Sequence, residues 1–425
     1  MNKKLVALAV AGAFALPLAA QAQTANVTLY GRLNLDFEFV KGQQALGACG
    51  DPTSDCNPTV NRLSSNSSRL GVRGTESLGG GLNAIFQIES NISGDTGNAA
   101  SSGLASRETF VGLQGSWGKF TVGKFLAPQD DLHPIFGNAP TLTTSILSTA
   151  DLWAQGTLSK GAGGFDARLG NSLRYDTPNM SGFTAALQYS TRDSSGDQQN
   201  FVSCSLTSAS QTTCPTPAPG NGGDNGDHPS ELRHAWVIGA NVIYANGPLN
   251  LGAAYEKNHE VRATGLDDTD WTLTGAYDFG TIMGGFGLRL GLVYEKTKYE
   301  TPTGDLKRDF WGASATVPVG GGKIYLFYGR AGNGKGGAAD GTTVGGLVKG
   351  PETASKQWEL SYSYSLSPRT LLYTGYVKLN NDCNAKYTFN INAYTINTAH
   401  NVTSPDSVPC NGEPSGLVFG IVHFF

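Results

Sequence analysis

The sequence is poor in charge, in methionine and in long apolar runs. Only 15% of its 425 residues are charged, against roughly 25% in an average soluble protein. Three methionines and the lack of long Glu/Lys-rich helical patterns argue against an α-helical enzyme. After residue 22, no stretch approaches the ~20 apolar residues that a membrane-spanning helix needs, which excludes a multi-helix transporter. The chain has instead 57 glycines, 16 tyrosines and 19 phenylalanines, a composition typical of a β-protein.

The first 22 residues have the three parts of a secretory signal peptide. Lys3 and Lys4 form the charged start, residues 5–18 form the apolar run, and Ala20-Gln21-Ala22 is a small-x-small cleavage site. We therefore expect a mature chain of one domain, residues 23–425. Removing the signal peptide changes the formal net charge from −4 to −6. Such a balance provides no basic surface for nucleic acid.

The six cysteines agree with export to an oxidising compartment. They fall in three local pairs, each inside a polar stretch: Cys49 and Cys56, Cys204 and Cys214, Cys383 and Cys410. We predict one disulfide within each pair. A metal site is the alternative, but the sequence has no CxxC and no His-x-x-x-His spacing. We therefore expect no metal and no cofactor.

Residues 27–39 alternate between apolar and polar side chains for thirteen positions. Val27, Leu29, Leu33, Leu35, Phe37 and Phe39 share one face, whereas Thr28, Tyr30, Arg32, Asn34, Asp36 and Glu38 share the other. About 9–11 tilted residues suffice for a strand to cross a bilayer. The pattern predicts fifteen further strands, near residues 67–74, 81–90, 107–114, 119–124, 167–176, 182–191, 232–244, 248–256, 270–279, 285–297, 309–317, 322–330, 357–366, 370–380 and 415–425. A total of about sixteen suits a bacterial single-chain barrel.

The connections between these strands alternate between short and long. Short turns occur at residues 74–81, 115–118 and 245–248, whereas 191–231, 331–356 and 381–414 are long and polar. Short periplasmic turns and long external loops are typical of outer-membrane barrels. All six cysteines lie in the long set. A soluble propeller would show a repeat of about 40–50 residues, and the sequence has none.

Several segments resemble the trimeric general porins of β-proteobacteria, over nearly the whole mature chain. Each motif is weak alone, and their order and spacing carry the resemblance. The motifs are Val27-Thr28-Leu29-Tyr30-Gly31, residues 68–76 (SRLGVRGTE), 78–82 (LGGGL), 106–113 (SRETFVGL), 171–175 (NSLRY) and the terminal Phe425. The resemblance implies a transmembrane antiparallel β-barrel of about sixteen strands in the outer membrane, with a long third loop folded into the pore.

The same resemblance implies how the protein works and assembles. The barrel would be a passive water-filled channel for small hydrophilic solutes and ions. It would form a homotrimer in contact with outer-membrane lipid and lipopolysaccharide. The barrel assembly machinery would insert it, with Phe425 as the assembly signal.

By family position, the third loop spans residues 124–164 and forms a charged constriction with the barrel wall. Residues 131–137 (DLHPIFG) resemble the family's loop motif, but Ile135 stands where an acidic residue usually follows the proline. The basic side would be Arg32, Arg69, Arg107 and Arg168, on the first, second, fourth and sixth strands, and the acidic side Asp130 and Asp131. Arg73 and Arg174 could join or replace the basic set.

Four arginines against two aspartates predict a weakly anion-leaning pore. Charges near the narrowest point should outweigh distant loop charges, which salt screens beyond ~10 Å at 0.1 M. A substrate-specific channel is an alternative, but it would show an aromatic ladder or a row of binding residues. A secreted soluble β-protein or adhesin would need no detergent for extraction. A hydrolase would need a serine, a histidine and an orienting acid in a recognisable setting, so we expect no enzyme.

Overall fold

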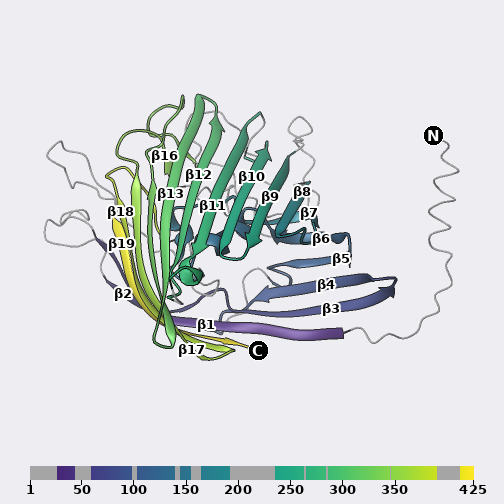
Figure 1. Ribbon diagram of the computed structural model, residues 1–425. Coiled ribbons are helices and arrows are strands. Elements are labelled where there is room, and N and C mark those ends of the chain that lie inside the picture. The colour runs from purple at the N-terminus through teal and green to yellow at the C-terminus, as the bar shows by residue number, and fades with distance from the viewer. Residues whose placement is uncertain are drawn as a thin grey trace, which may run out of the picture.

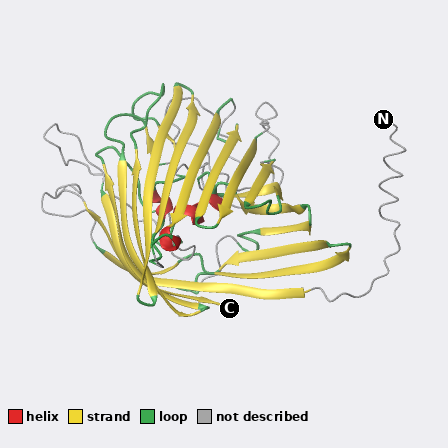
Figure 2. Cartoon of the chain, viewed as in Figure 1, coloured by secondary structure: helices red, strands yellow, loops and turns green. Residues whose placement is uncertain are grey.

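The computed structural model describes residues 26–43, 59–97, 103–138, 144–154, 164–191, 235–262, 265–283, 286–344, 346–389 and 412–425. This part of the chain is almost entirely β-sheet (Figures 1 and 2). The strands are β1 (Asn26–Gln43), β2 (Val60–Ser65), β3 (Arg69–Gly79), β4 (Leu82–Asn91), β5 (Thr109–Gly115), β6 (Gly118–Leu126), β7 (Arg168–Asp176), β8 (Phe183–Ser190), β9 (Trp236–Asn246), β10 (Leu249–His259), β11 (Asp267–Asp278), β12 (Arg289–Thr301), β13 (Gly304–Val319), β14 (Gly322–Ala331), β15 (Thr343–Val344), β16 (Leu347–Val348), β17 (Ser355–Ser367), β18 (Thr370–Asn381) and β19 (Glu413–Phe424).

The helices of the described residues are short. They are η1 (Asp130–Leu132), α2 (His133–Phe136), η2 (Thr149–Asp151) and η3 (Phe279–Thr281). None of the helices in these parts of the chain is long and apolar enough to cross a membrane.

The main sheet closes on itself into an antiparallel barrel. Successive strands pair along the chain, except that β2 and β3 both pair with β1 and that β14 pairs with β17. The strand β19 pairs with β1 over twelve residues, Arg32–Gln43 against 413–424. In Figure 1, the yellow last strand β19 accordingly lies beside the purple first strand β1. Closure satisfies the backbone hydrogen bonds of both edge strands, which a barrel in lipid requires.

The seventeen segments of the main sheet make sixteen wall strands, because β2 and β3 are two halves of one strand. Residues 35–40 of β1 pair with β2, and residues 26–32 of β1 pair with β3. The interruption at residues 66–68 includes Ser67, whose φ of 52° breaks the extended backbone. The predicted count of sixteen is confirmed.

The predicted strands all occur, with small differences at their ends. The fourth was expected from residue 107 but starts at Thr109, and the one expected from 232 starts at Trp236. Sequence alternation missed β2, whose residues Val60–Ser65 are mostly polar. It also missed the hairpin of β15 and β16, which lies inside the predicted loop 331–356.

The barrel is apolar outside and polar inside. On β1, Leu29 is 62% exposed, whereas Asn34 and Glu38 on the opposite face are fully buried. The same outward exposure of large apolar side chains recurs on the other strands, for example at Leu292 and Phe419. A water-soluble protein reverses this arrangement. The outward apolar band is that of a barrel that faces lipid.

Candidate functional site

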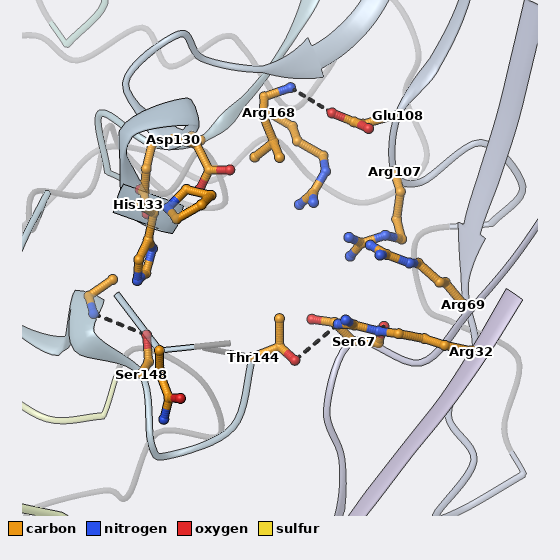
Figure 3. A pocket seen from close by; sticks show the side chains of 16 residues that line it. Arg32, Ser67, Arg69, Arg107, Glu108, Asp130, His133, Thr144, Ser148 and Arg168 are labelled. Carbon is orange, nitrogen blue, oxygen red and sulfur yellow. Dashed lines mark hydrogen bonds between the residues drawn. The ribbon is translucent and has the colours of Figure 1, made fainter. Parts of the chain in front are cut away.

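Four arginines from distant parts of the chain line one cavity of about 410 Å³ inside the barrel. Arg32 lies on β1 and Arg69 on β3, Arg107 precedes β5 by two residues, and Arg168 is the first residue of β7. Figure 3 shows Arg32, Arg69 and Arg107 on one side and Asp130 and His133 on the other. The cavity therefore brings together the four arginines named from the sequence, together with one of the two aspartates.

Register explains how the arginines on β1 and β3 meet. Arg32 and Arg69 lie directly opposite each other in the antiparallel pair. Opposed like charges destabilise a sheet unless other groups compensate them. The Arg32 guanidinium donates to the Ser67 carbonyl at 3.3 Å and to Thr144 Oγ1 at 3.0 Å. Thr144 belongs to the connection between β6 and β7, so this bond joins the wall to that connection (Figure 3).

Glu89 is the counter-ion of this basic wall, a role that was not predicted from the sequence. Its carboxylate lies 2.5 Å from Arg107 Nε and 3.5 Å from Arg69 Nε, and it accepts a hydrogen bond from Tyr30 Oη at 3.1 Å. Arg168 makes no ion pair within the described residues. Glu89 thus partly neutralises two arginines and leaves Arg32 and Arg168 as less compensated cations. Its only signal in the sequence is an inward position on the third predicted strand.

The acidic side of the cavity carries less negative charge than its carboxyl groups suggest. Burial, together with the nearby Asp166, raises the pKa of Asp130 to about 8. Burial also raises the pKa of Asp166 to about 6. Both groups lie in the connection between β6 and β7, outside the strands. At neutral pH, Asp130 is therefore mostly protonated, and the arginines dominate the charge of the cavity.

Asp131 points away from this cavity. Its carboxylate accepts hydrogen bonds from Arg174 at 2.6 Å and from Asn241 at 2.8 Å. Arg174 is further paired with Asp176 at 2.8 Å, so it serves this cluster rather than the four-arginine cavity. Arg73 stacks on the ring of Tyr30 at 4.9 Å and is likewise absent from the cavity lining. Adjacent residues diverge here because Asp130 and Asp131 lie in the 3₁₀ turn η1, where successive side chains project roughly 120° apart.

We call residues 127–167, which connect β6 and β7, the β6–β7 segment; they begin and end three residues later than the predicted loop. Polar groups of the inner wall hold its described parts. Gln129 donates to Asp270 on β11 at 2.6 Å, and Asn138 donates to Glu359 on β17 at 2.7 Å. These bonds reach strands far from β6 around the barrel.

A buried ion pair forms hydrogen bonds with the backbone of the β6–β7 segment at residues 152 and 154. Arg308 on β13 and Glu295 on β12 form a salt bridge with no exposed side-chain surface. Arg308 Nη1 donates to the carbonyl of Leu152 at 2.7 Å, and Glu295 accepts from the amide of Ala154 at 2.6 Å. We call these two side chains the β12–β13 clamp. It satisfies backbone groups that would otherwise be buried without partners.

Inward-facing glycines make room for the apolar side chains of the segment. At five of them, a Cβ atom would lie no more than 3.0 Å from an atom of the segment. These glycines and the residues against them are Gly239 with Pro128, Gly252 with Leu132 and Ile135, Gly291 with Phe136, Gly375 with Leu147, and Gly416 with Ile146. Ile135, where the family motif has an acid, therefore packs on the wall.

His133 is a packing residue of the segment. Its ring stacks on Phe136 with centroids 5.4 Å apart, meets Trp153 edge-on at 5.1 Å, and bonds to Thr149. Burial lowers the pKa of His133 to about 4. The ring is therefore neutral at physiological pH and adds no charge to the cavity.

A model of the Gram-negative porin family matches residues 7–384. The chain belongs to this family. The porin is 29% identical over 435 residues to outer membrane porin protein 32 of Delftia acidovorans, with both chains covered completely. It is 28% identical to an outer membrane porin protein of Bordetella pertussis, over 88% of this chain and 93% of that one.

Solved structures agree with this assignment. The anion-selective porin from Comamonas acidovorans matches with a TM-score of 0.62 and 26% identity, over 94% of this chain and 100% of that chain. OmpT of Vibrio cholerae matches with a TM-score of 0.58 at 14% identity, over 96% and 99%, and shares the fold. The protein is a multi-pass outer-membrane barrel and a general diffusion porin. The comparisons do not favour a substrate-specific channel.

Several sequence predictions concern the chain ends and the cysteines. Cys383 is disulfide-bonded, whereas the other five cysteines lie outside the described residues, so the three pairings stay predictions. Residues 1–22 also lie outside them, and the signal peptide stays a prediction. Phe425 exchanges two 3.1 Å backbone hydrogen bonds with Gly31, and its ring covers that glycine. The terminal residue is thus part of the seam that closes the barrel.

Replacing Gly416 with valine should loosen the β6–β7 segment. The new side chain would occupy the space of Ile146, and overpacking of this kind costs ~1–3 kcal/mol. We expect a lower thermal midpoint in detergent and larger, noisier single-channel currents. Gly275→Val is the matched control, because Gly275 lies on the outward face of β11. Steady wild-type currents in Gly416→Val would contradict this role of the glycine.

Proposed function

We propose that this porin prefers anions and that the β6–β7 segment narrows its channel at the four-arginine cavity. The observation that carries the proposal is the meeting of Arg32, Arg69, Arg107 and Arg168 around one cavity opposite that segment. The similarity to the anion-selective porin from Comamonas acidovorans supports it.

The physical basis is a local excess of positive charge in a confined path. A sixteen-stranded barrel leaves an aqueous lumen that its wall side chains do not fill. Low-dielectric walls concentrate the field of charges at a narrow point, and rings or clusters of charge there select permeating ions. Because the Asp130 pKa is raised to about 8, the acidic side is weakened at neutral pH. Anions therefore meet the lower barrier.

The proposal includes the setting in which the channel works. The porin would act as a homotrimer among outer-membrane lipid and lipopolysaccharide, without catalysis, and would pass small hydrophilic solutes. The barrel assembly machinery would insert it. The bonding of Phe425 to Gly31 supports the assembly role, because it places the terminal residue at the β1–β19 seam where the barrel closes.

The test is the reversal potential of refolded mature protein in a planar bilayer under a salt gradient. Stepwise conductance with an anion-directed potential is the expected result. Conductance with a cation-directed potential would overturn the anion preference and leave the porin assignment intact. Absence of conductance, from protein shown to be folded, would overturn the proposal of an open channel.

The anion preference should fall as the pH rises. Asp166 ionises near pH 6 and Asp130 near pH 8, so each step adds one negative charge beside Arg168 and Glu108 in the cavity. We expect the reversal potential to move toward cations in two steps between about pH 5 and pH 9. The Asp130→Asn/Asp166→Asn variant should lose both steps. A profile that is equally steep in this variant would rule out the two groups as the source.

A further inference from the structure

Two cations face each other on the outer wall of the barrel. Arg330 near the end of β14 lies directly opposite Lys356 near the start of β17, and both side chains are exposed. Leu326 and Leu360, four residues away on the same strands, are 45% and 52% exposed. Because side chains alternate along a strand, all four lie on the same outward face. We call Arg330 and Lys356 the outer cation pair.

The described part of the chain offers this pair no carboxylate within 4.0 Å. The acids on the same face of nearby strands have other partners: Asp309 lies 3.8 Å from Lys335, and Glu413 lies 3.1 Å from Lys378. Directly opposed like charges destabilise a sheet. An anion from outside the chain would therefore reduce the repulsion between these two opposed cations.

Aromatic rings set the height of the pair relative to the membrane. Trp311 lies opposite Arg330, and Tyr328 lies opposite Trp358 one step toward the short-turn end. The Tyr328 and Trp358 ring centroids are 4.3 Å apart, and Trp358 is 52% exposed. Trp and Tyr gather where a bilayer meets water. The outer cation pair is level with Trp311 and lies just beyond Tyr328 and Trp358, on the side of the long 332–354 connection, which is the external side.

We propose that the outer cation pair binds the phosphate group of a lipid in the external leaflet. The planar guanidinium of Arg330 offers two parallel N–H donors to phosphate oxygens, and the Lys356 ammonium adds a second charge. Hydrocarbon and rings below the site lower the local dielectric and strengthen these contacts. The inference rests on the lipid contact proposed above and states where on the barrel that contact is made. It does not depend on the ion selectivity of the channel.

The test uses the refolded porin in phosphatidylcholine vesicles, with brominated phosphatidic acid or brominated phosphatidylcholine as quencher of tryptophan fluorescence. We expect phosphatidic acid to be preferred, and Arg330→Gln/Lys356→Gln to weaken that preference by about tenfold. The matched control is Lys349→Gln/Lys386→Gln, which removes the same charge from two external connections and leaves the Asp309–Lys335 pair intact. It should keep the wild-type preference.

Three results would overturn the proposal. The first is an unchanged lipid preference in the Arg330→Gln/Lys356→Gln variant. The second is an equal loss in the control variant, which would show only a general effect of charge. The third is full displacement of phosphatidic acid by inorganic phosphate alone, which would make the site one for free anions. Normal conductance and circular dichroism of each variant establish that it is folded, and they keep this test separate from that of selectivity.

Discussion

Replacing Arg69 and Arg107 together with glutamine shifts the permeability ratio toward cations, by about tenfold or more. The change removes two positive charges from the cavity and also frees the carboxylate of Glu89, which both arginines neutralise. A freed anion beside the path acts in the same direction as the lost cations. The reversal potential under a salt gradient measures the shift.

A third substitution separates these two contributions. In Arg69→Gln/Arg107→Gln/Glu89→Gln, the same cations are lost but no anion is freed, so the shift should be smaller than in the double variant. Lys335→Gln/Lys349→Gln changes the net charge equally at a distance that salt screens, and should leave the potential unchanged. A shift in the lysine variant as large as that in the double variant would show that total charge, and not the cavity, governs selectivity.

Replacing Arg308 with methionine should have the largest effect on the β6–β7 segment. Glu295 would be left buried without its partner, and the Leu152 carbonyl would lose its donor. Breaking a buried ion pair on one side costs ~3–5 kcal/mol. We expect a lower midpoint of urea unfolding from detergent micelles, together with larger and fluctuating single-channel currents as the segment leaves the wall.

The double variant Arg308→Met/Glu295→Leu distinguishes stability from anchoring. Replacing both charges by apolar groups is often neutral for stability, so the unfolding midpoint should return toward the wild type. The backbone of residues 152–154 would still lack its partners, so the currents should remain large. If currents recover along with stability, the clamp stabilises the wall and does not position the segment.

Strand order and wall orientation were predictable because they depend on local chemistry. Alternation with a period of two is set by backbone geometry, and residues 27–39 show it without reference to any other part of the chain. The same pattern placed Arg32 on the polar face, where the structure has it. Local alternation failed at β2, because Val60–Ser65 forms a strand through its pairing with β1 and not through its own pattern.

The partners inside the barrel were not predictable, because they depend on register between distant strands. Nothing local distinguishes Asp130 from Asp131, yet one lines the cavity and the other pairs with Arg174. From the sequence, Ile135 could be interpreted only as the loss of an acidic group. In the structure, its side chain fills the space that Gly252 leaves on the inner wall. The role of Glu89 as a counter-ion depends on the fold, which places Arg69 and Arg107 beside its carboxylate.

The sequence by itself therefore determined a sixteen-stranded barrel with its lipid-facing and water-facing surfaces, and its resemblance to porins named four arginines that the structure brings to one cavity. Only the tertiary structure decided which charges are neutralised, how the β6–β7 segment is held, and where two cations remain exposed at Arg330 and Lys356. The reason is physical. Alternation acts over neighbouring residues, whereas the energy of a charge depends on every group that the closed barrel places near it.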